Sequence, residues 1–331
     1  MQKTKPKSGR WMIIVSLIIA ALLAICFFVG NYFYNFAIKA KGRNRENVGG
    51  PDFSERLPGN EGGSFLTSDF FETQGIQDAY ISASQDGTEL YSRVAENSAS
   101  DAWVIVVHGY RSDGGGMSGY AGRFYKLGFS VLAPDLRGNG RSGGGYYGMG
   151  WDDRLDIIDW IDYLNESYDD PEIVLFGISM GGAAVMMTSG EKLPENVKAI
   201  IEDSGYSSIY AQFKSEIKTM YDLPAFPLLN MAGAVTQLRA GYNFMNEGDA
   251  VGQVAKSVTP ILFIHGREDT LVPFSMLEEV YSAAACEREK LEVEGAGHGE
   301  SAVVAPEIYW NTVQAFLSRH LDYNIAAQDA A

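Results

Sequence analysis

Residues 173–184 read IVLFGISMGGAA, an apolar run that ends in Gly-Ile-Ser-Met-Gly-Gly. The spacing G-x-S-x-G is typical of a strand that turns sharply into a helix and holds its serine at the apex. Side chains at positions 177 and 181 would collide within such a turn, so glycine is required at both. A glycine-rich turn without any chemistry would show the same short pattern. The catalytic interpretation of Ser179 therefore depends on the rest of the chain.

The sequence around this turn alternates between strand and helix patterns. Residues 79–95 contain two alternating segments around Asp86-Gly87, which predicts a β-hairpin. Helical patterns separate six short runs, most of them too apolar for strands with one face in water. These runs are 103–109, 129–135, 172–179, 197–204, 260–266 and 290–295. The alternation predicts an α/β fold with a mostly parallel central sheet and helices on both faces.

Two further segments carry expectations about packing. In residues 155–167, one helical face gathers four apolar side chains: Leu155, Ile158, Ile161 and Leu164. The acidic residues of 152–162 are then expected on a solvated face. Residues 206–258 are too long for a simple crossover and contain several aromatic and methionine side chains. We expect them to form an inserted helical cap over the carboxyl edge of the sheet, where ligands of open α/β sheets bind.

The N-terminal segment predicts a membrane anchor. Residues 11–30 are 20 residues without a charge, which is long enough to span a bilayer. The apolar character continues beyond them and no typical cleavage site follows, which favours an uncleaved signal anchor over a cleaved signal peptide. We therefore expect a basic tail over 1–10, the transmembrane anchor over 11–30, a juxtamembrane linker over 31–65 and a folded domain over 66–325. Basic residues flank the span on both sides, so the charges hardly determine its orientation. An N-terminal anchor before a folded domain favours a single-pass membrane protein with that domain outside the cytoplasm.

The charge distribution excludes one class of partner. Residues 1–45 hold eight basic and no acidic residues, which leaves 18 basic against 42 acidic residues in the remainder, a net charge of −24. A domain with this negative charge repels nucleic acid, so we expect no nucleic-acid partner. The two cysteines, Cys26 and Cys286, lie far apart in the sequence and predict neither a disulfide framework nor a cysteine-based zinc site.

Five motifs occur in an order that resembles the α/β-hydrolase superfamily over residues 76–320. They are VIVVHGY (104–110), VLAPDLRGNGRSGG (131–144), GISMGG (177–182), LFIHGREDTLVP (262–273) and GAGHGES (295–301). The resemblance is to bacterial serine hydrolases of the carboxylesterase-like or serine-aminopeptidase-like kind, and it implies the α/β-hydrolase fold.

The motifs supply a candidate catalytic triad. A serine hydroxyl needs a base within hydrogen-bond reach, and that base needs an acid that orients it. His298, on a glycine-rich loop, is the candidate base. Asp269 is the candidate acid, and the chain order Ser179, Asp269, His298 is that of α/β-hydrolases. Asp203 remains an alternative acid, because some relatives carry the acid after the sixth strand.

Other residues of the motifs have expected supporting roles. The backbone N–H groups of Met180 and Tyr110 are the candidate oxyanion donors. His108 and His265 both precede a glycine at a strand end, so we expect them to support loops. Asp135 precedes the serine in the chain, which does not fit the acid of this triad order, and is expected to order its own loop.

The predicted function is that of a serine hydrolase, without metal or cofactor, that cleaves carboxylic esters through an acyl-enzyme. The aromatic and methionine side chains of the predicted cap favour an ester of moderate size with an apolar part. A serine aminopeptidase of the prolyl type is the alternative, and it would need cap carboxylates near the pocket. The available carboxylates are Glu216, Asp222, Glu247 and Asp249. A transacylase acting on lipid or cell-wall material and a non-catalytic binding domain are weaker alternatives.

Overall fold

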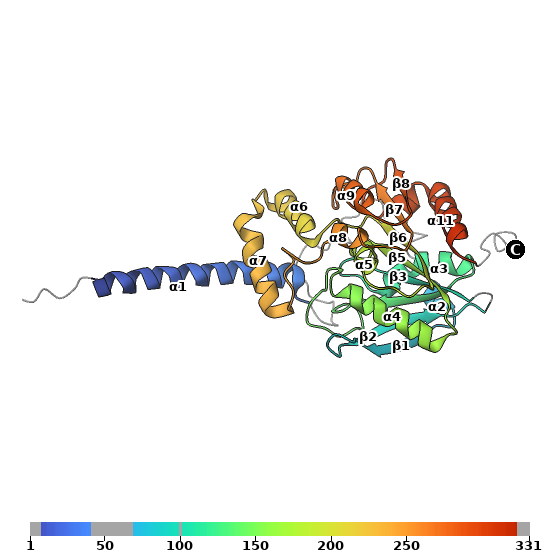
Figure 1. Ribbon diagram of the computed structural model, residues 1–331, viewed down its shortest axis with the longest axis horizontal. Coiled ribbons are helices and arrows are strands. Elements are labelled where there is room, and N and C mark those ends of the chain that lie inside the picture. The colour runs from blue at the N-terminus through green and yellow to red at the C-terminus, as the bar shows by residue number, and fades with distance from the viewer. Residues whose placement is uncertain (1–7, 41–68, 99–100, 323–331) are drawn as a thin grey trace, which may run out of the picture.

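The computed structural model describes residues 8–40, 69–98 and 101–322 (Figure 1). Most of the expected basic tail and residues 41–65 of the expected linker lie outside the described residues. Within the described residues, eight strands form one sheet in the order β1-β2-β4-β3-β5-β6-β7-β8. The strands are β1 Gln77–Ser82, β2 Glu89–Ala95, β3 Ala102–Val107, β4 Ser130–Asp135, β5 Glu172–Ile178, β6 Val197–Asp203, β7 Ile261–Gly266 and β8 Arg288–Val293.

The sheet is mostly parallel, as the alternating pattern predicts. β1 and β2 form the expected antiparallel hairpin, and β2 pairs antiparallel with β4. Every later neighbour pair is parallel. In β3, β4 and β7 each residue is buried. This burial on both faces explains why these strands read as continuous apolar runs.

Helices cover both faces of the sheet. The α-helices of the described residues are α1 Ser8–Phe33, α2 Phe70–Thr73, α3 Ser118–Lys126, α4 Asp153–Ser167, α5 Met180–Thr188, α6 Ile209–Tyr221, α7 Ala225–Ala240, α8 Ala250–Val254, α9 Ser275–Ala283, α10 Ser301–Val304 and α11 Pro306–His320. A π-helical turn, η1 (Tyr34–Ile38), and a 3₁₀ turn, η5 (Gly114–Met117), complete the set. α4, α5, α8 and α9 pack in the core on one face, and α3 and α11 pack on the other.

The packing of α4 corrects two expectations. Its buried side chains are Asp153, Asp156, Ile157, Trp160, Ile161 and Leu164, so the stripe is rotated from the predicted one. Asp153 and Asp156 are buried rather than solvated. Asp153 accepts the N–H of Gly150 at 2.6 Å, and Asp156 is paired with Arg137, whose side chain is 1% exposed. The guanidinium of Arg137 donates from Nε and Nη2 to the two carboxylate oxygens of Asp156, at 2.7 and 2.6 Å. A buried charge is tolerated only with such a partner.

Three helices, α6 to α8, lie between β6 and β7, in the segment where inserted helices were expected. We call α6 and α7 the cap. Figure 1 shows the cap on the side of the domain from which α1 emerges, with α7 lying across α1. Residues Trp11–Ile38 form a helix long and apolar enough to cross a membrane, and its most apolar stretch is not buried in the protein. The fold therefore joins a long exposed apolar helix to the cap.

The end of this helix is not the linker that the sequence led us to expect. Tyr34 is 5% and Ile38 is 1% exposed, and both belong to the main hydrophobic core. Tyr147 N–H donates to Ile38 O at 2.7 Å, and Ala40 N–H donates to Gly145 O at 3.0 Å. Residues 34–40 are thus part of the folded domain, because the apolar sequence continues past the membrane-length segment and is buried there.

Candidate active site

Ser179 lies at the apex of the turn between β5 and α5. Its φ of 58° and ψ of −120° are strained for a non-glycine residue. A Cβ at Gly177 would lie 2.2 Å from Gly181 O, and a Cβ at Gly181 would lie 2.1 Å from Val107 O. Both glycines are therefore required by close backbone contacts, as the motif predicts. Ser179 N–H donates to Asp203 O at 2.8 Å, which holds the turn against β6.

The three candidate triad residues meet at the carboxyl edge of the sheet. His298 Nε2 lies 2.8 Å from Ser179 Oγ, and His298 Nδ1 lies 2.8 Å from Asp269 Oδ2. The other oxygen of Asp269 accepts the N–H groups of Leu271 and Val272 at 2.9 and 2.8 Å. These contacts form a continuous hydrogen-bonded chain from the carboxylate through the imidazole to the serine.

The acid of this chain is held in its ionised form. Burial by itself would raise the pKa of Asp269, but hydrogen bonds and charge from His265 and His298 outweigh it and lower the pKa to about 2. An ionised carboxylate at Nδ1 favours the tautomer in which Nε2 accepts the serine proton. The arrangement is therefore the one that a serine nucleophile and its base require.

Asp203, the alternative acid, lies at the end of β6 and does not hold the imidazole. Its Oδ1 accepts the Ser204 hydroxyl at 2.9 Å, and Ser204 Oγ in turn accepts the N–H of Gly299 at 3.3 Å. Burial raises the pKa of Asp203 to about 6, against the hydrogen bond from Ser204. In this geometry Asp203 supports the loop that carries His298.

His265 contacts the candidate acid, which sequence reasoning missed. Its Nε2 lies 3.0 Å from Val272 O and 3.2 Å from Asp269 Oδ2, and the side chain is fully buried. Burial would lower the pKa of His265, but the hydrogen bond to Asp269 and the nearby Glu202 raise it. The sequence held one signal for this contact: His265 lies at the end of a strand, only four residues before Asp269. Asp269 thus lies between two imidazoles.

The candidate oxyanion donors lie beside the serine. Met180 is the first residue of α5. On the other side, a Cβ at Gly109 would lie 3.4 Å from Ser179 Cβ, so the loop that leads to Tyr110 lies directly against Ser179. His108 donates from Nδ1 to Gly109 O at 2.7 Å and accepts the N–H of Leu136 at 2.9 Å. The loop-supporting role expected of His108 is confirmed.

Asp135 also orders a loop, as expected. One of its carboxylate oxygens accepts Gly114 N–H at 2.7 Å, and the other accepts Arg141 N–H at 2.6 Å. Arg93 donates to the same carboxylate at 3.1 Å. These bonds join the segment after Tyr110 to the loop after β4, away from His298.

A cavity of about 310 Å³ opens in front of Ser179 and His298. Three other parts of the chain also line this cavity. They are the loops at the carboxyl edge of the sheet with the start of α5 (Tyr110, Met149 and Met180), α6 (Phe213, Glu216 and Met220) and η1 (Phe36 and Ala37). Of the aromatic and methionine residues in the loop before α4, only Met149 lines this cavity; Tyr147 instead packs edge-on against Tyr110. The site is therefore mainly apolar and is enclosed partly by the N-terminal helix.

Glu216 is the carboxyl group among the residues that line this cavity. Gln212 Nε2 donates to it at 3.0 Å, and burial raises the pKa of Glu216 to about 7. The other three carboxylates considered for the cap lie elsewhere: Asp222 pairs with Lys218 on the surface, Glu247 accepts Asn243 N–H at 2.6 Å, and Asp249 precedes α8. Within the described residues, no group of three or more His, Cys, Asp or Glu side chains could hold a metal ion.

Comparisons with known proteins agree with this architecture. A family model described as "Serine aminopeptidase, S33" matches residues 98–223. The uncharacterized protein YqkD of Bacillus subtilis is 27% identical over 220 residues, 66% of this chain and 72% of that protein. A monoacylglycerol lipase of Mycolicibacterium smegmatis is 25% identical over 227 residues, 57% of this chain and 78% of that protein.

Among solved structures, the esterase Pf2001 of Pyrococcus furiosus superposes with a TM-score of 0.63 at 24% sequence identity. The superposition covers 76% of this chain and 96% of the esterase. The similarity therefore extends over nearly the whole of that enzyme and about three quarters of this chain. The chain has the fold of the α/β-hydrolase superfamily.

Proposed function

We propose that the protein is a serine hydrolase that cleaves carboxylic esters through an acyl-enzyme on Ser179. The observation that carries the proposal is the hydrogen-bonded chain Ser179–His298–Asp269, with both contacts to the imidazole at 2.8 Å. Such a chain activates a hydroxyl that is a poor nucleophile on its own.

The mechanism follows from the positions of these groups. Ser179 Oγ attacks the ester carbonyl while His298 Nε2 takes its proton, and Asp269 stabilises the imidazolium that forms. The N–H groups of Met180 and Tyr110 donate to the oxyanion of the tetrahedral intermediate. His298 then gives the proton to the leaving alcohol. In the second half, His298 takes a proton from water, which attacks the acyl carbonyl. The bond to Ser179 Oγ then breaks, and His298 returns the proton to Ser179 Oγ as the acid is released.

An ester fits the site better than a charged substrate. The residues that line the cavity are mainly apolar, and Glu216 is its carboxyl group, with a pKa raised by burial to about 7. Similar proteins named as an esterase and as a monoacylglycerol lipase support the same class of reaction. We include membrane attachment in the proposal: α1 would anchor the protein, with the catalytic domain outside the cytoplasm.

The test uses the full-length protein in lipid nanodiscs, with Ser179→Ala as the matched variant. Wild type should react with a fluorophosphonate probe and hydrolyse p-nitrophenyl esters. Ser179→Ala should not be labelled, and its kcat should fall by several orders of magnitude, about a millionfold in a comparable triad. A folded wild type that neither reacts with the probe nor hydrolyses any ester would contradict the proposal and favour a binding domain.

An aminopeptidase is a second candidate because Glu216 lines the cavity and could hold a substrate ammonium group. The family model named for a serine aminopeptidase points the same way. Prolyl and alanyl aminocoumarin amides distinguish the two. If the protein is an aminopeptidase, it should cleave these amides, and Glu216→Gln should raise their KM while leaving neutral esters less affected. No cleavage of the amides beside rapid ester hydrolysis would reject this candidate.

A further inference from the structure

The N-terminal helix is bonded to the loop that carries a candidate oxyanion donor. Tyr110 Oη donates to Ala37 O at 2.7 Å, and Arg111 Nη2 donates to Phe36 O at 2.6 Å. Both acceptors are backbone carbonyls of η1, which directly continues α1. Two side chains of this loop therefore hold the end of the apolar helix through its main-chain carbonyls, and Phe36 and Ala37 line the same cavity as Ser179.

The same helix is also fixed to the cap. A Cβ at Gly30 would lie 2.3 Å from Met231 O and 2.8 Å from Val235 Cγ2, so α1 and α7 cross in close backbone contact. Arg239 donates to Asn31 Oδ1 and lies over the ring of Tyr34, 4.9 Å from its centroid. The position of the helix on the cap is thus set by a glycine contact and by a cation–π contact.

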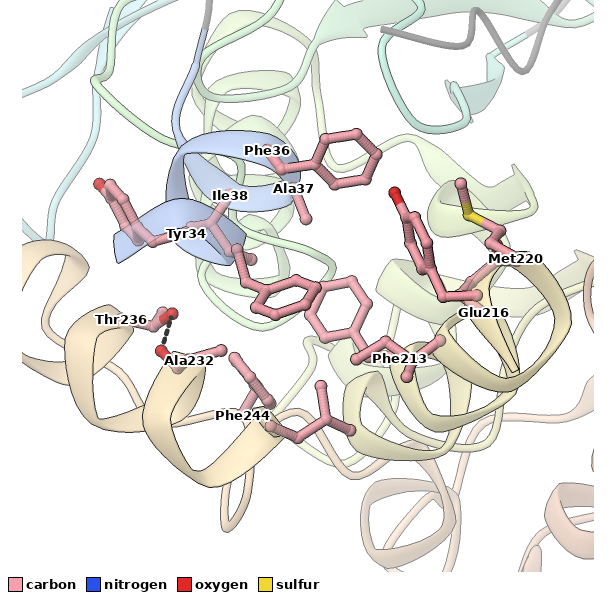
Figure 2. A pocket seen from close by; sticks show the side chains of 14 residues that line it. Tyr34, Phe36, Ala37, Ile38, Phe213, Glu216, Met220, Ala232, Thr236 and Phe244 are labelled. Atoms are coloured by element: carbon pink, nitrogen blue, oxygen red, sulfur yellow. Dashed lines mark hydrogen bonds between the residues drawn. The ribbon is translucent and has the colours of Figure 1, made fainter. Parts of the chain in front are cut away.

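A second cavity lies between η1 and the cap. Figure 2 shows Phe36 and Ala37 of η1 on one side of it and Phe213 and Met220 of α6 on the other. On the α7 side it is lined by Ala232 and Thr236, whose hydroxyl is used in a bond to Ala232 O. The two cavities share lining residues, namely Phe36, Ala37, Phe213, Glu216 and Met220. They therefore adjoin, and the second cavity, of about 50 Å³, lies on the side of the N-terminal helix.

We propose that Phe36 and Ala37, with α6 and α7, form an acyl tunnel, and that the substrate is an ester with one long, unbranched acyl chain. This inference rests on the proposed function and names its substrate class. The carbonyl would lie at Ser179 and the chain would run between η1 and the cap. The walls of the second cavity are almost entirely apolar, which suits a hydrocarbon chain and not a peptide. α1 has exposed apolar side chains along its length, so the tunnel begins where a bilayer would supply such esters.

The test measures how hydrolysis depends on acyl length, with full-length protein in nanodiscs and p-nitrophenyl esters from acetate to decanoate. In wild type, kcat/KM should rise with each added methylene, up to about fourfold per group. Ala37→Phe places a ring at the junction of the two cavities and leaves the backbone acceptor of Tyr110 in place. It should lower the ratio of kcat/KM for decanoate to that for acetate by about tenfold or more, equal to the loss of two buried methylenes.

Ala234→Phe is the matched control, because Ala234 is exposed on α7 and lines neither cavity. Its decanoate-to-acetate ratio should equal that of wild type. Phe36→Ala is a second variant for the case that Ala37→Phe does not fold. It widens the tunnel and should raise the relative rate for branched acyl groups. The tunnel would be overturned if the folded variants showed the same dependence of kcat/KM on acyl length and branching as wild type.

A binding measurement separates this inference from the proposed function. The probe is a dansyl-labelled undecanoic acid, titrated into Ser179→Ala protein and corrected with protein-free nanodiscs. Adding Ala37→Phe should weaken its binding by about tenfold. If the probe binds in this manner but no ester is hydrolysed, the tunnel stands and the proposed function fails. If esters are hydrolysed by Ser179 but neither binding nor length profile responds to Ala37→Phe, the proposed function stands and the tunnel is wrong.

Discussion

The two sides of the cavity are built by different physical means. On the sheet side, directional hydrogen bonds and a strained turn place Ser179, His298 and Asp269. On the cap side, the side chains of Phe36, Phe213 and their neighbours line the cavity with mainly apolar surface. Directional bonds require particular residue types at particular positions, whereas apolar contacts require only shape and volume. Changes on the sheet side should therefore act on the rate of reaction, and changes on the cap side should act on the choice of substrate.

The largest expected effect tests the sheet side. Asp269→Asn should lower kcat by about 10⁴-fold, because an amide at Nδ1 favours the wrong tautomer of His298. Asp203→Asn is the matched variant, since Asp203 is also a buried aspartate near the imidazole but bonds to Ser204. We expect its kcat to fall far less. Steady-state kinetics on a short ester measure both, with thermal unfolding as the folding control. Equal losses in the two variants would restore Asp203 as a candidate acid.

A substitution at the contact between α1 and α7 should affect the stability of the domain and its choice of ester, by less than the change in kcat expected for Asp269→Asn. Gly30→Leu overfills the contact with Met231 and should destabilise the domain by about 1–3 kcal/mol. By displacing the helix from the cap, it should also lower the decanoate-to-acetate ratio. Thermal unfolding in nanodiscs and the same ester series measure the two results. Ala24→Leu, on an exposed part of α1, is the control. An unchanged melting temperature for Gly30→Leu would show that the helix does not pack on the cap.

The smallest expected effect concerns the buried acid beneath the site. Burial raises the pKa of Glu202 to about 8, opposed by the charge of His265 and by the N–H of Gly205. The folded state therefore favours the protonated acid, and this stability is complete below the pKa of the unfolded chain, near 4.5. It is lost as the pH rises through about 8. Glu202→Gln should accordingly raise the melting temperature more at about pH 9 than at about pH 5. The same shift at both pH values would contradict a protonated Glu202.

The contrast between the two sides also decides what the sequence could predict. The turn at Ser179 and the order of the candidate triad residues follow from short motifs, because each backbone conformation there permits few residue types. The contact of residues 34–40 with residues 145–147 joins segments far apart in the chain, and no local pattern marks it. The buried face of α4 was predicted wrongly for a similar reason. Asp156 is buried in a pair with Arg137, which comes from a different loop, and Asp153 accepts the N–H of Gly150.

The bonds from Tyr110 and Arg111 to the end of the helix have a mechanical consequence. A flexible tether would let the catalytic domain rotate and move away from the membrane, so that Ser179 could reach substrates at variable heights. Here the apolar helix continues directly into η1, whose carbonyls accept hydrogen bonds from the side chains of Tyr110 and Arg111. If α1 spans a bilayer, Ser179 stands at one fixed height and one fixed orientation above it. The domain is then held rigidly, and Ser179 can act only on substrates at the lipid surface.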